Sequence, residues 1–252
     1  MVVVTGASRG IGRAVALAAA RRGARVGLIA RSADLLEAVL AEAGGAGLAA
    51  PADVADRGAL EAALRRIEEA LGPIDVLVNN AGVGAYGRFA DQAPEVVERV
   101  LRVNLLGTAH AMRAVLPGML ARGRGHIVNV ASVAGRIGVP MEAAYAASKF
   151  GVVGLSEAVA LEVASRGVRV SVVYPGAVAT GFFEARGRPY TLRRPRPIPP
   201  ERVAEEVISV VERGRAEAFV PRFLRVATIA RALAPGLTRR GTAFALRREL
   251  RR

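Results

Sequence analysis

The chain has 252 residues, 52% of them hydrophobic, so it holds enough apolar material for one large domain. It contains no cysteine, which excludes disulfides, thiolate metal ligands and a cysteine nucleophile, and we expect no metal site. The net charge is +14, but the tail from Arg222 to Arg252 carries nine arginines against one acid, Glu249. Because this tail supplies most of the surplus and aromatic residues make up only 4% of the chain, we expect no nucleic-acid partner.

Signals for export or membrane insertion are missing from the sequence. The apolar run Met1–Thr5 is short and lacks a basic leader, so it does not resemble a signal peptide. No uncharged apolar stretch approaches the roughly 18 residues needed to cross a bilayer. The expected location is the cytoplasm.

Short runs rich in β-branched and small apolar residues alternate along the chain with longer alanine-rich stretches. The runs predict strands over Val2–Thr5, Arg25–Ala30, Leu48–Ala52, Ile74–Asn79, His126–Ala131 and Val168–Tyr174, and near Ala218–Pro221. The stretches between them predict helices over Ile11–Arg22, Ala33–Ala43, Arg57–Leu71, Pro94–Ala121, Met141–Ser165 and Glu201–Arg213. The fourth of these helices is expected to break or bend near Asn104–Gly107 and Pro117. A loop rich in proline and arginine is expected over Gly176–Pro200.

Strands that are apolar on both faces and separated by helices predict a parallel sheet covered on both sides. The expected fold class is α/β, a doubly wound Rossmann-type sheet of about seven strands with helices on both faces. Its ligand crevice should lie at the carboxyl ends of the strands. Residues 1–221 are expected to form one domain, and residues 222–252 a basic, helical C-terminal extension.

A glycine-rich turn, Thr5-Gly6-Ala7-Ser8-Arg9-Gly10-Ile11-Gly12, lies between the first strand and the first helix. Glycine permits a tight turn and lets a pyrophosphate approach the amino end of the helix. In a chain with 28 glycines such a turn can also be ordinary. Its strand–turn–helix setting favours a dinucleotide site.

The end of the second strand bears on the choice of cofactor. NAD enzymes usually carry Asp or Glu there, and that carboxylate repels a 2′-phosphate. This strand instead ends Ile29-Ala30-Arg31-Ser32, and Arg31 can bind a phosphate together with Arg9. The alternative is that both are ordinary surface arginines. We expect NADP(H).

Tyr145 and Lys149 are spaced i, i+4, which places both side chains on one face of a helix. A nearby ammonium should lower the tyrosine pKa from its usual value near 10 and so suit it to proton transfer. Y-x3-K also occurs by chance, but Lys149 is the only lysine in the chain. Ser132, after the fifth strand, is placed to donate a hydrogen bond to a carbonyl oxygen. Asn79-Asn80-Ala81-Gly82 closes the fourth strand in the same crevice.

Taken together, these motifs resemble the short-chain dehydrogenase/reductase family, in its single-domain type with T-G-x3-G-x-G, N-N-A-G, S, Y-x3-K and P-G-x3-T. The resemblance covers about residues 1–221, in the family's order and spacing. It implies an NADP(H)-dependent oxidoreductase that transfers a hydride between nicotinamide and a carbonyl or secondary alcohol.

The resemblance also assigns roles residue by residue. It implies a catalytic tetrad of Asn104, Ser132, Tyr145 and Lys149, in which Asn104 anchors a water leading to Lys149. The implied cofactor-binding residues are Gly6, Ser8, Arg9, Gly10, Ile11, Gly12, Arg31, Asp53, Val54, Asn80, Ala81, Gly82, Tyr145, Lys149, Pro175, Gly176, Val178 and Thr180. In the implied reaction, Ser132 and Tyr145 bind the carbonyl oxygen, and Tyr145 gives up its proton as the alkoxide forms.

The sequence departs from the family's pattern after Phe219-Val220-Pro221. Many members end there in a short segment that packs into a tetramer, whereas this chain continues into its basic tail. A homodimer or a homotetramer is expected, with the tetramer in question. Phe223, Val226, Ala227, Ala230 and Leu233 form an apolar stripe at helical spacing. The stripe is expected to pack on the domain or a partner subunit, or else to lie on an anionic membrane surface.

The residues expected to line the substrate pocket are apolar: Val133, Val139, Met141, Phe182 and Phe183. They favour a hydrophobic small-molecule carbonyl or alcohol substrate. The loop arginines could instead receive an acidic carrier such as acyl-carrier protein or coenzyme A, which would make the enzyme a 3-oxoacyl-thioester reductase. These arginines are Arg186, Arg188, Arg193, Arg194 and Arg196.

Two other functional classes compete with a reductase. An epimerase or dehydratase can share Y-x3-K, but it usually needs a longer C-terminal substrate domain. A non-catalytic NADP-sensing module would be expected to have lost Tyr145 or Lys149, and both are present.

Overall fold

The computed structural model describes residues 1–191, 195–236, 238 and 240–241. The strands form one sheet in the order β3-β2-β1-β4-β5-β6-β7, and every neighbouring pair is parallel. Their bounds are β1 Val2–Thr5, β2 Val26–Ala30, β3 Gly47–Pro51, β4 Val76–Asn79, β5 Gly125–Val130, β6 Val168–Pro175 and β7 Glu217–Val220. The predicted doubly wound α/β fold is confirmed.

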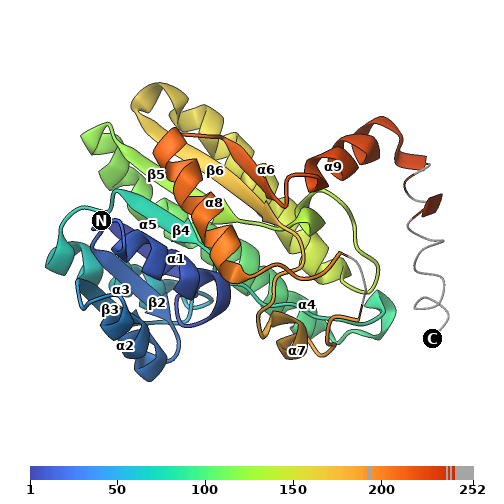
Figure 1. Cartoon of the computed structure of the whole chain (residues 1–252), viewed down its shortest axis with the longest axis horizontal. Helices are drawn as coiled ribbons and strands as arrows, with labels where there is room; N and C mark the ends of the chain where they lie inside the picture. The colour runs from blue at the N-terminus through green and yellow to red at the C-terminus, as the bar shows by residue number, and fades with distance from the viewer. Residues whose placement is uncertain (192–194, 237, 239, 242–252) are drawn as a thin grey trace.

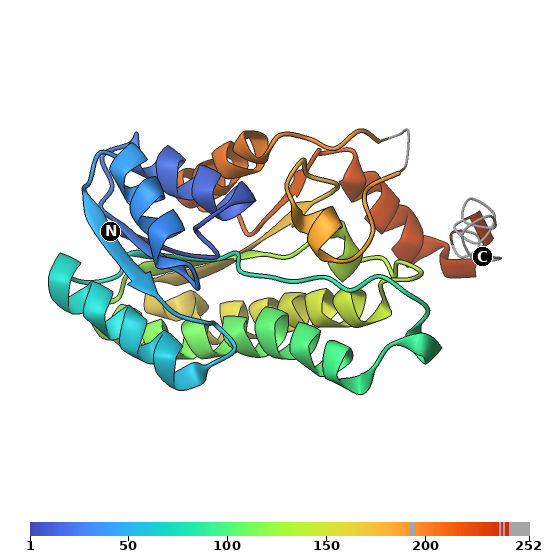
Figure 2. The ribbon, with the colours of Figure 1, turned by 90° about the horizontal axis from the view of Figure 1, so that it is seen from below.

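Helices cover both faces of this sheet (Figures 1 and 2). One layer consists of α1 (Gly10–Ala20), α2 (Ala33–Glu42) and α8 (Pro200–Arg213). The other layer consists of α3 (Arg57–Leu71), α5 (Gly107–Arg122) and α6 (Ala143–Val163), with α4 (Pro94–Leu101) preceding α5. Two apolar clusters, one on each side of the sheet, therefore form most of the core.

The predicted helix over residues 94–121 divides where the sequence indicated a break. A π-helical segment, Arg102–Leu106, joins α4 to α5, while Pro117 stays inside α5 without interrupting it. Asn104 lies in this segment with its side chain fully buried. Because a π-turn interrupts the regular i→i−4 ladder, it re-aims a side chain, and such turns are frequent at functional sites.

Two further helices lie in segments expected to be a loop and a tail. A single turn, α7 (Phe182–Ala185), forms within residues 176–200, and α9 (Leu224–Leu233) follows β7. Of the loop and tail arginines singled out in the sequence, Arg193, Arg194, Arg239, Arg247, Arg248, Arg251 and Arg252 lie outside the described residues.

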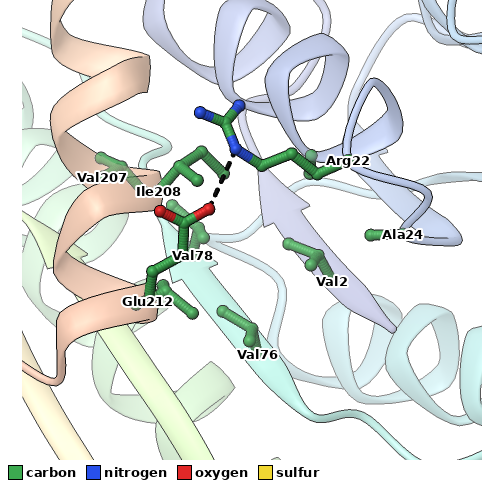
Figure 3. Close-up of a pocket in the computed structure, with 10 residues that line it drawn as sticks. Val2, Arg22, Ala24, Val76, Val78, Val207, Ile208 and Glu212 are labelled. Atoms are coloured by element: carbon green, nitrogen blue, oxygen red, sulfur yellow. Dashed lines mark hydrogen bonds and ion pairs between the residues drawn. The ribbon is translucent and has the colours of Figure 1, made fainter.

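A small apolar pocket of about 170 Å³ lies at the amino edge of the sheet, lined by Val2, Val76 and Val207 among others (Figure 3). Arg22 lies at this pocket and pairs with Glu205 at 2.7 Å and Glu212 at 3.0 Å. These pairs tie α1 to α8. The pocket is at the opposite edge from the carboxyl ends of the strands, where the motifs gather.

Candidate active site

The glycine turn is shaped by contacts that leave no room for side chains. Gly6 has a positive φ of 65°, and a Cβ on Gly12 would lie 2.2 Å from the Gly6 carbonyl oxygen. No side-chain cap bonds the amino end of α1, which begins at Gly10. The first N–H groups of a helix have no partner within it and, together with the helix dipole, suit a phosphate. These residues therefore fit the pyrophosphate of a dinucleotide.

Asn80 and Thr5 hold this turn in place. The Asn80 side-chain amide donates to the carbonyl oxygens of Thr5 (3.1 Å) and Gly6 (3.3 Å). The Thr5 hydroxyl in turn accepts hydrogen bonds from the backbone N–H groups of Asn80 and Ala81, at 3.0 and 3.1 Å. The glycine motif and N-N-A-G thus form one hydrogen-bonded unit, as their common position at the carboxyl edge predicted.

The segment after β6 reaches the same turn. A Cβ on Gly10 would come within 2.9 Å of the Thr180 methyl carbon, so Thr180 lies against the glycine turn. Val178 is buried and pairs with Ile198 in an isolated parallel bridge, which fixes the course of the chain between them. Residues 175–180 are therefore brought beside the first βα turn although about 170 residues separate the two in sequence.

Arg9 and Arg31 flank the amino-terminal part of the crevice. Both are exposed, and in the described part of the chain neither makes an ion pair with a carboxylate. Asp53 follows β3, and one of its carboxylate oxygens accepts a hydrogen bond from the Ala55 N–H at 2.9 Å. Val54 beside it is buried. The two guanidinium groups are thus available to an anionic ligand.

Lys149 is buried among groups of α6 and β5. Its side chain is 5% exposed, and Nζ donates to the Val130 carbonyl oxygen at 2.9 Å. Burial lowers the pKa of Lys149 to about 8. The amine therefore changes charge near neutral pH, which a solvated lysine does not do.

Tyr145 lies beside Lys149, with Nζ 5.8 Å from the centre of the phenol ring. Burial raises the pKa of Tyr145 to about 12, and hydrogen bonding with Ser132 opposes part of that rise. We expected Lys149 to lower this pKa below its usual value, but burial dominates and the pKa is raised. Removal of the phenol from water outweighs the effect of its charged and polar neighbours, while the Lys149 ammonium also donates to the Val130 carbonyl oxygen.

Asn104 uses its whole side chain to hold the loop after β4. Its Oδ1 accepts from the Val83 N–H at 2.8 Å, and its Nδ2 donates to the Val83 carbonyl oxygen and to the Ser148 hydroxyl, both at 2.9 Å. A Cβ on Gly82 would lie 3.3 Å from Oδ1 and 3.6 Å from Lys149 Nζ. Asn104 and Lys149 therefore flank the same glycine.

Ser148 is a site residue that sequence reasoning missed. Its hydroxyl donates to the Tyr145 carbonyl oxygen at 2.7 Å and accepts from Asn104, so it links two members of the expected tetrad. Its position inside Tyr145-Ala-Ala-Ser-Lys149 was the available signal. Ser132 is also fixed locally, because its hydroxyl accepts from the Ala134 N–H at 3.1 Å.

Phe182 and Phe183 of α7, together with Val139, lie at or beside Tyr145 and are here called the lid. The Phe182 ring centre lies 5.3 Å from that of Tyr145, and Val139 packs in the same cluster. Phe183 contacts Phe182 with ring centres 5.9 Å apart. Three of the residues expected in the pocket, Val139, Phe182 and Phe183, thus gather at or beside the phenol and give it apolar neighbours.

An ion pair that the sequence did not indicate lies next to this lid. Arg186 forms an ion pair with Glu142, and its guanidinium carbon lies 4.7 Å from the centre of the Phe183 ring and 5.0 Å from that of Tyr86. The Arg186 side chain is 6% exposed. The expectation that Arg186 receives an acidic carrier is therefore wrong, because the tertiary fold buries this arginine against Glu142.

The residue before Glu142 adopts an unusual backbone conformation. Met141 has a φ of 67°, a region that side chains other than glycine rarely occupy, and its carbonyl accepts from the Gly87 N–H at 2.8 Å. Such conformations persist where the surroundings impose them, commonly at functional sites. Here the strained residue positions Glu142 for Arg186.

No group of three or more His, Cys, Asp or Glu side chains in the described part of the chain could hold a metal ion. No helix in that part of the chain is long and apolar enough to span a membrane.

The chain is similar in sequence to known dehydrogenases. A family model described as short chain dehydrogenase matches residues 1–190. A relative from Xanthobacter autotrophicus, named inactive 2-(S)-hydroxypropyl-CoM dehydrogenase 2, is 46% identical over 166 residues, which are 66% of this chain and 72% of the relative.

Solved structures are similar over most of the chain. A variant of the actinorhodin polyketide ketoreductase with NADPH is 35% identical, with a TM-score of 0.81 over 88% of this chain and 96% of that one. A short chain dehydrogenase/reductase from Burkholderia phymatum in complex with NAD is 28% identical, with a TM-score of 0.86 over 94% of each chain. The two neighbours thus hold different nicotinamide cofactors.

Proposed function

The chain belongs to the short-chain dehydrogenase/reductase family of oxidoreductases, and from this premise we propose that it transfers a hydride between NADP(H) and the carbonyl or alcohol carbon of an apolar substrate. Tyr145 is the proton donor and acceptor. The observation that carries the proposal is the burial of Tyr145, Ser132 and Lys149 together at the carboxyl edge of the sheet, beside the glycine turn.

The geometry gives each of these residues a task. Because its pKa is raised, Tyr145 keeps its proton at neutral pH and can donate it to an oxygen that becomes an alkoxide. Ser132, whose hydroxyl opposes part of the rise in the pKa of the phenol, is placed to donate to the same oxygen. Lys149 supplies a nearby positive charge that favours the phenolate left behind. NADP(H), when bound, supplies or accepts the hydride.

Asn104 and Ser148 act through these groups and do not contact the substrate. Asn104 fixes the loop at Val83, and Ser148 bonds both Asn104 and the carbonyl of Tyr145. The proposed water between Asn104 and Lys149 belongs in the space beside Gly82, which both side chains flank. In this arrangement the proton lost by Tyr145 is replaced from solvent, through that water and Lys149.

NADP(H) is favoured over NAD(H) by the charges around the crevice. Arg31 follows the end of β2, where an NAD enzyme usually carries a carboxylate, and Arg9 lies at the start of α1. Both are exposed and make no ion pair with a carboxylate in the described part of the chain, so a 2′-phosphate bound there would meet two positive charges.

The apolar lid favours a hydrophobic carbonyl compound over a sugar. Phe182 and Val139 pack in one cluster with Tyr145, and Arg186 and Glu142 already form an ion pair with each other. A 3-oxoacyl thioester is the second candidate, favoured by the likeness to a polyketide ketoreductase. A carrier would then have to be received by arginines at the rim, such as Arg188 and Arg196.

We also propose a homodimer formed through α6. Phe150 and Leu161 lie three helical turns apart on one face of this helix and are 44% and 82% exposed. A helix–helix contact with a second copy would bury them.

Replacing Tyr145 with Phe tests the assignment of the proton donor. Tyr145→Phe should bind NADPH nearly as well as the wild type, measured by fluorescence titration, and should reduce turnover about 10²-fold or more. The assay is NADPH oxidation with a panel of ketones, aldehydes and 3-oxoacyl thioesters. Lys149→Arg should also turn over poorly, because a planar guanidinium cannot reproduce the geometry of an ammonium.

Two results would contradict the proposal. Near-normal turnover of Tyr145→Phe would show that another group supplies the proton. NADPH binding by the wild type without turnover of any compound in the panel, and without product in the reverse direction, would favour a non-catalytic sensing module.

A further inference from the structure

Helix α9 presents large apolar side chains to solvent. Phe223, which precedes it, is 58% exposed, and Val226, Ile229 and Leu233 are 69%, 48% and 82% exposed. In both views α9 extends outward from the body of the molecule after β7 (Figures 1 and 2). The expectation that the apolar stripe packs on its own domain is therefore wrong.

The domain contacts the other side of this helix. Leu224, Thr228 and Arg231 recur at intervals of four and three and are partly buried, and the Leu224 side chain lies against Gly176. Phe223, Val226, Ile229 and Leu233, here called the α9 apolar face, recur at intervals of three, three and four on the opposite side. Helix spacing thus separates an attached face from a free one.

Charge indicates what covers the free face. Between Arg222 and Arg248 the sequence contains no acidic residue, and Arg222, Arg225 and Arg240 are exposed in the structure. A second copy of α9 would bring these like charges together. An anionic surface with an apolar interior would satisfy both the arginines and the apolar face.

The position of α9 agrees with such a surface. In Figures 1 and 2 the helix lies toward the end of the molecule that also carries α4 and α7. Its contact with Gly176 places its first turn next to residues 175–180, which reach the glycine turn. A surface that bound α9 would therefore lie near residues 175–180 of the candidate active site.

We propose that the α9 apolar face and its arginines dock the protein on an anionic phospholipid surface. The apolar side chains enter the boundary between headgroups and acyl chains, and the arginines contact lipid phosphates. Docking does not depend on the proposed hydride transfer, and an apolar carbonyl compound dissolved in the lipid would reach the lid directly.

Vesicle co-sedimentation of the full chain tests this docking. The probes are vesicles of phosphatidylglycerol and phosphatidylcholine, compared with phosphatidylcholine alone, at about 0.05 M and 0.5 M salt. The wild type should sediment with the anionic vesicles at low salt and be released at high salt. It should remain in the supernatant with neutral vesicles.

Variants on exposed positions separate docking from folding. Val226→Glu/Leu233→Glu should abolish sedimentation, whereas Ala62→Glu/Ala70→Glu, which adds the same charge at exposed positions of α3, should retain most of it. Arg222→Gln/Arg225→Gln should weaken binding several-fold. Thermal unfolding of the three double variants should match that of the wild type, because all these side chains are exposed and the Arg225–Glu217 ion pair at 3.6 Å lies at the surface.

Three outcomes would overturn the proposal. These are a wild type that sediments with neither vesicle, a wild type that binds both vesicles equally, and a Val226→Glu/Leu233→Glu variant that binds as well as the wild type. If the wild type ignores vesicles and the same variant lowers its molecular mass in solution, the α9 apolar face belongs to a second copy of the chain.

Discussion

The two ends of the crevice are built by different means. Beside β1 and β2 the site depends on glycines that have no side chain, since a Cβ on Gly12 would lie 2.2 Å from the Gly6 carbonyl oxygen. Beside β5 and β6 it is shaped by buried polar atoms, since Lys149 and Asn104 are 5% and 0% exposed and hydrogen-bonded. At the first end, adding a side chain to Gly12 should disrupt the glycine turn. At the second end, activity should depend on the chemical identity of the buried polar side chains.

The largest effect is expected from adding one methyl group at the first end. Gly12→Ala must displace the backbone of the glycine turn, which should destabilise the fold by about 3 kcal/mol and weaken NADPH binding about 10²-fold or more. Thermal unfolding and fluorescence titration measure the two effects. Gly58→Ala on α3 is the control, because its Cβ would meet only the Asp56 side chain at 3.5 Å. If Gly12→Ala and Gly58→Ala had the same stability and the same NADPH affinity, the first end of the crevice would not depend on the absence of a side chain at Gly12.

A smaller effect is expected from reversing a charge at the same end. Arg31→Asp should remove the preference for NADPH over NADH, a change of about 1.5–3 kcal/mol for a charge-assisted contact. The measurement is the ratio of kcat/KM for the two cofactors. Arg66→Asp on α3 makes the same change of charge away from the crevice and should leave the ratio unaltered. If Arg31→Asp behaved like this control, the 2′-phosphate would be recognised elsewhere.

The smallest effect is expected from pH at the second end. The pKa of Lys149 is lowered to about 8, so its ammonium is present below pH 8 and is lost as the pH rises through that value. The Tyr145 proton, with a pKa raised to about 12, stays in place throughout. NADPH-dependent reduction should therefore fall about twofold at pH 8 and about tenfold by pH 9. A rate that stays flat to pH 10 would show that the charge on Lys149 is not used.

Motifs that act through the backbone were predictable because their chemistry is local. The glycine turn and the strand before it are adjacent in sequence, and the break at Asn104 followed from the interrupted helical pattern. The Arg186–Glu142 pair was not predictable, because its members lie 44 positions apart in sequence. The loop also holds several arginines, and nothing in the sequence shows which of them would pair with Glu142. The raised pKa of Tyr145 escaped prediction for a related reason, since burial depends on the packing of α6 and α7 against each other.

By itself the sequence determined the parallel sheet, its layers and the residues that meet at its carboxyl edge. Periodicity and strand-end position are properties of neighbouring residues, and a parallel sheet brings strand ends to one edge. Only the tertiary structure decided which charges are buried and which apolar faces are not. An apolar stripe that packs on its own domain and the exposed α9 apolar face have the same helical spacing in the sequence, so the sequence does not distinguish them. Desolvation and burial are set by what lies opposite a side chain, and residues distant in sequence determine that.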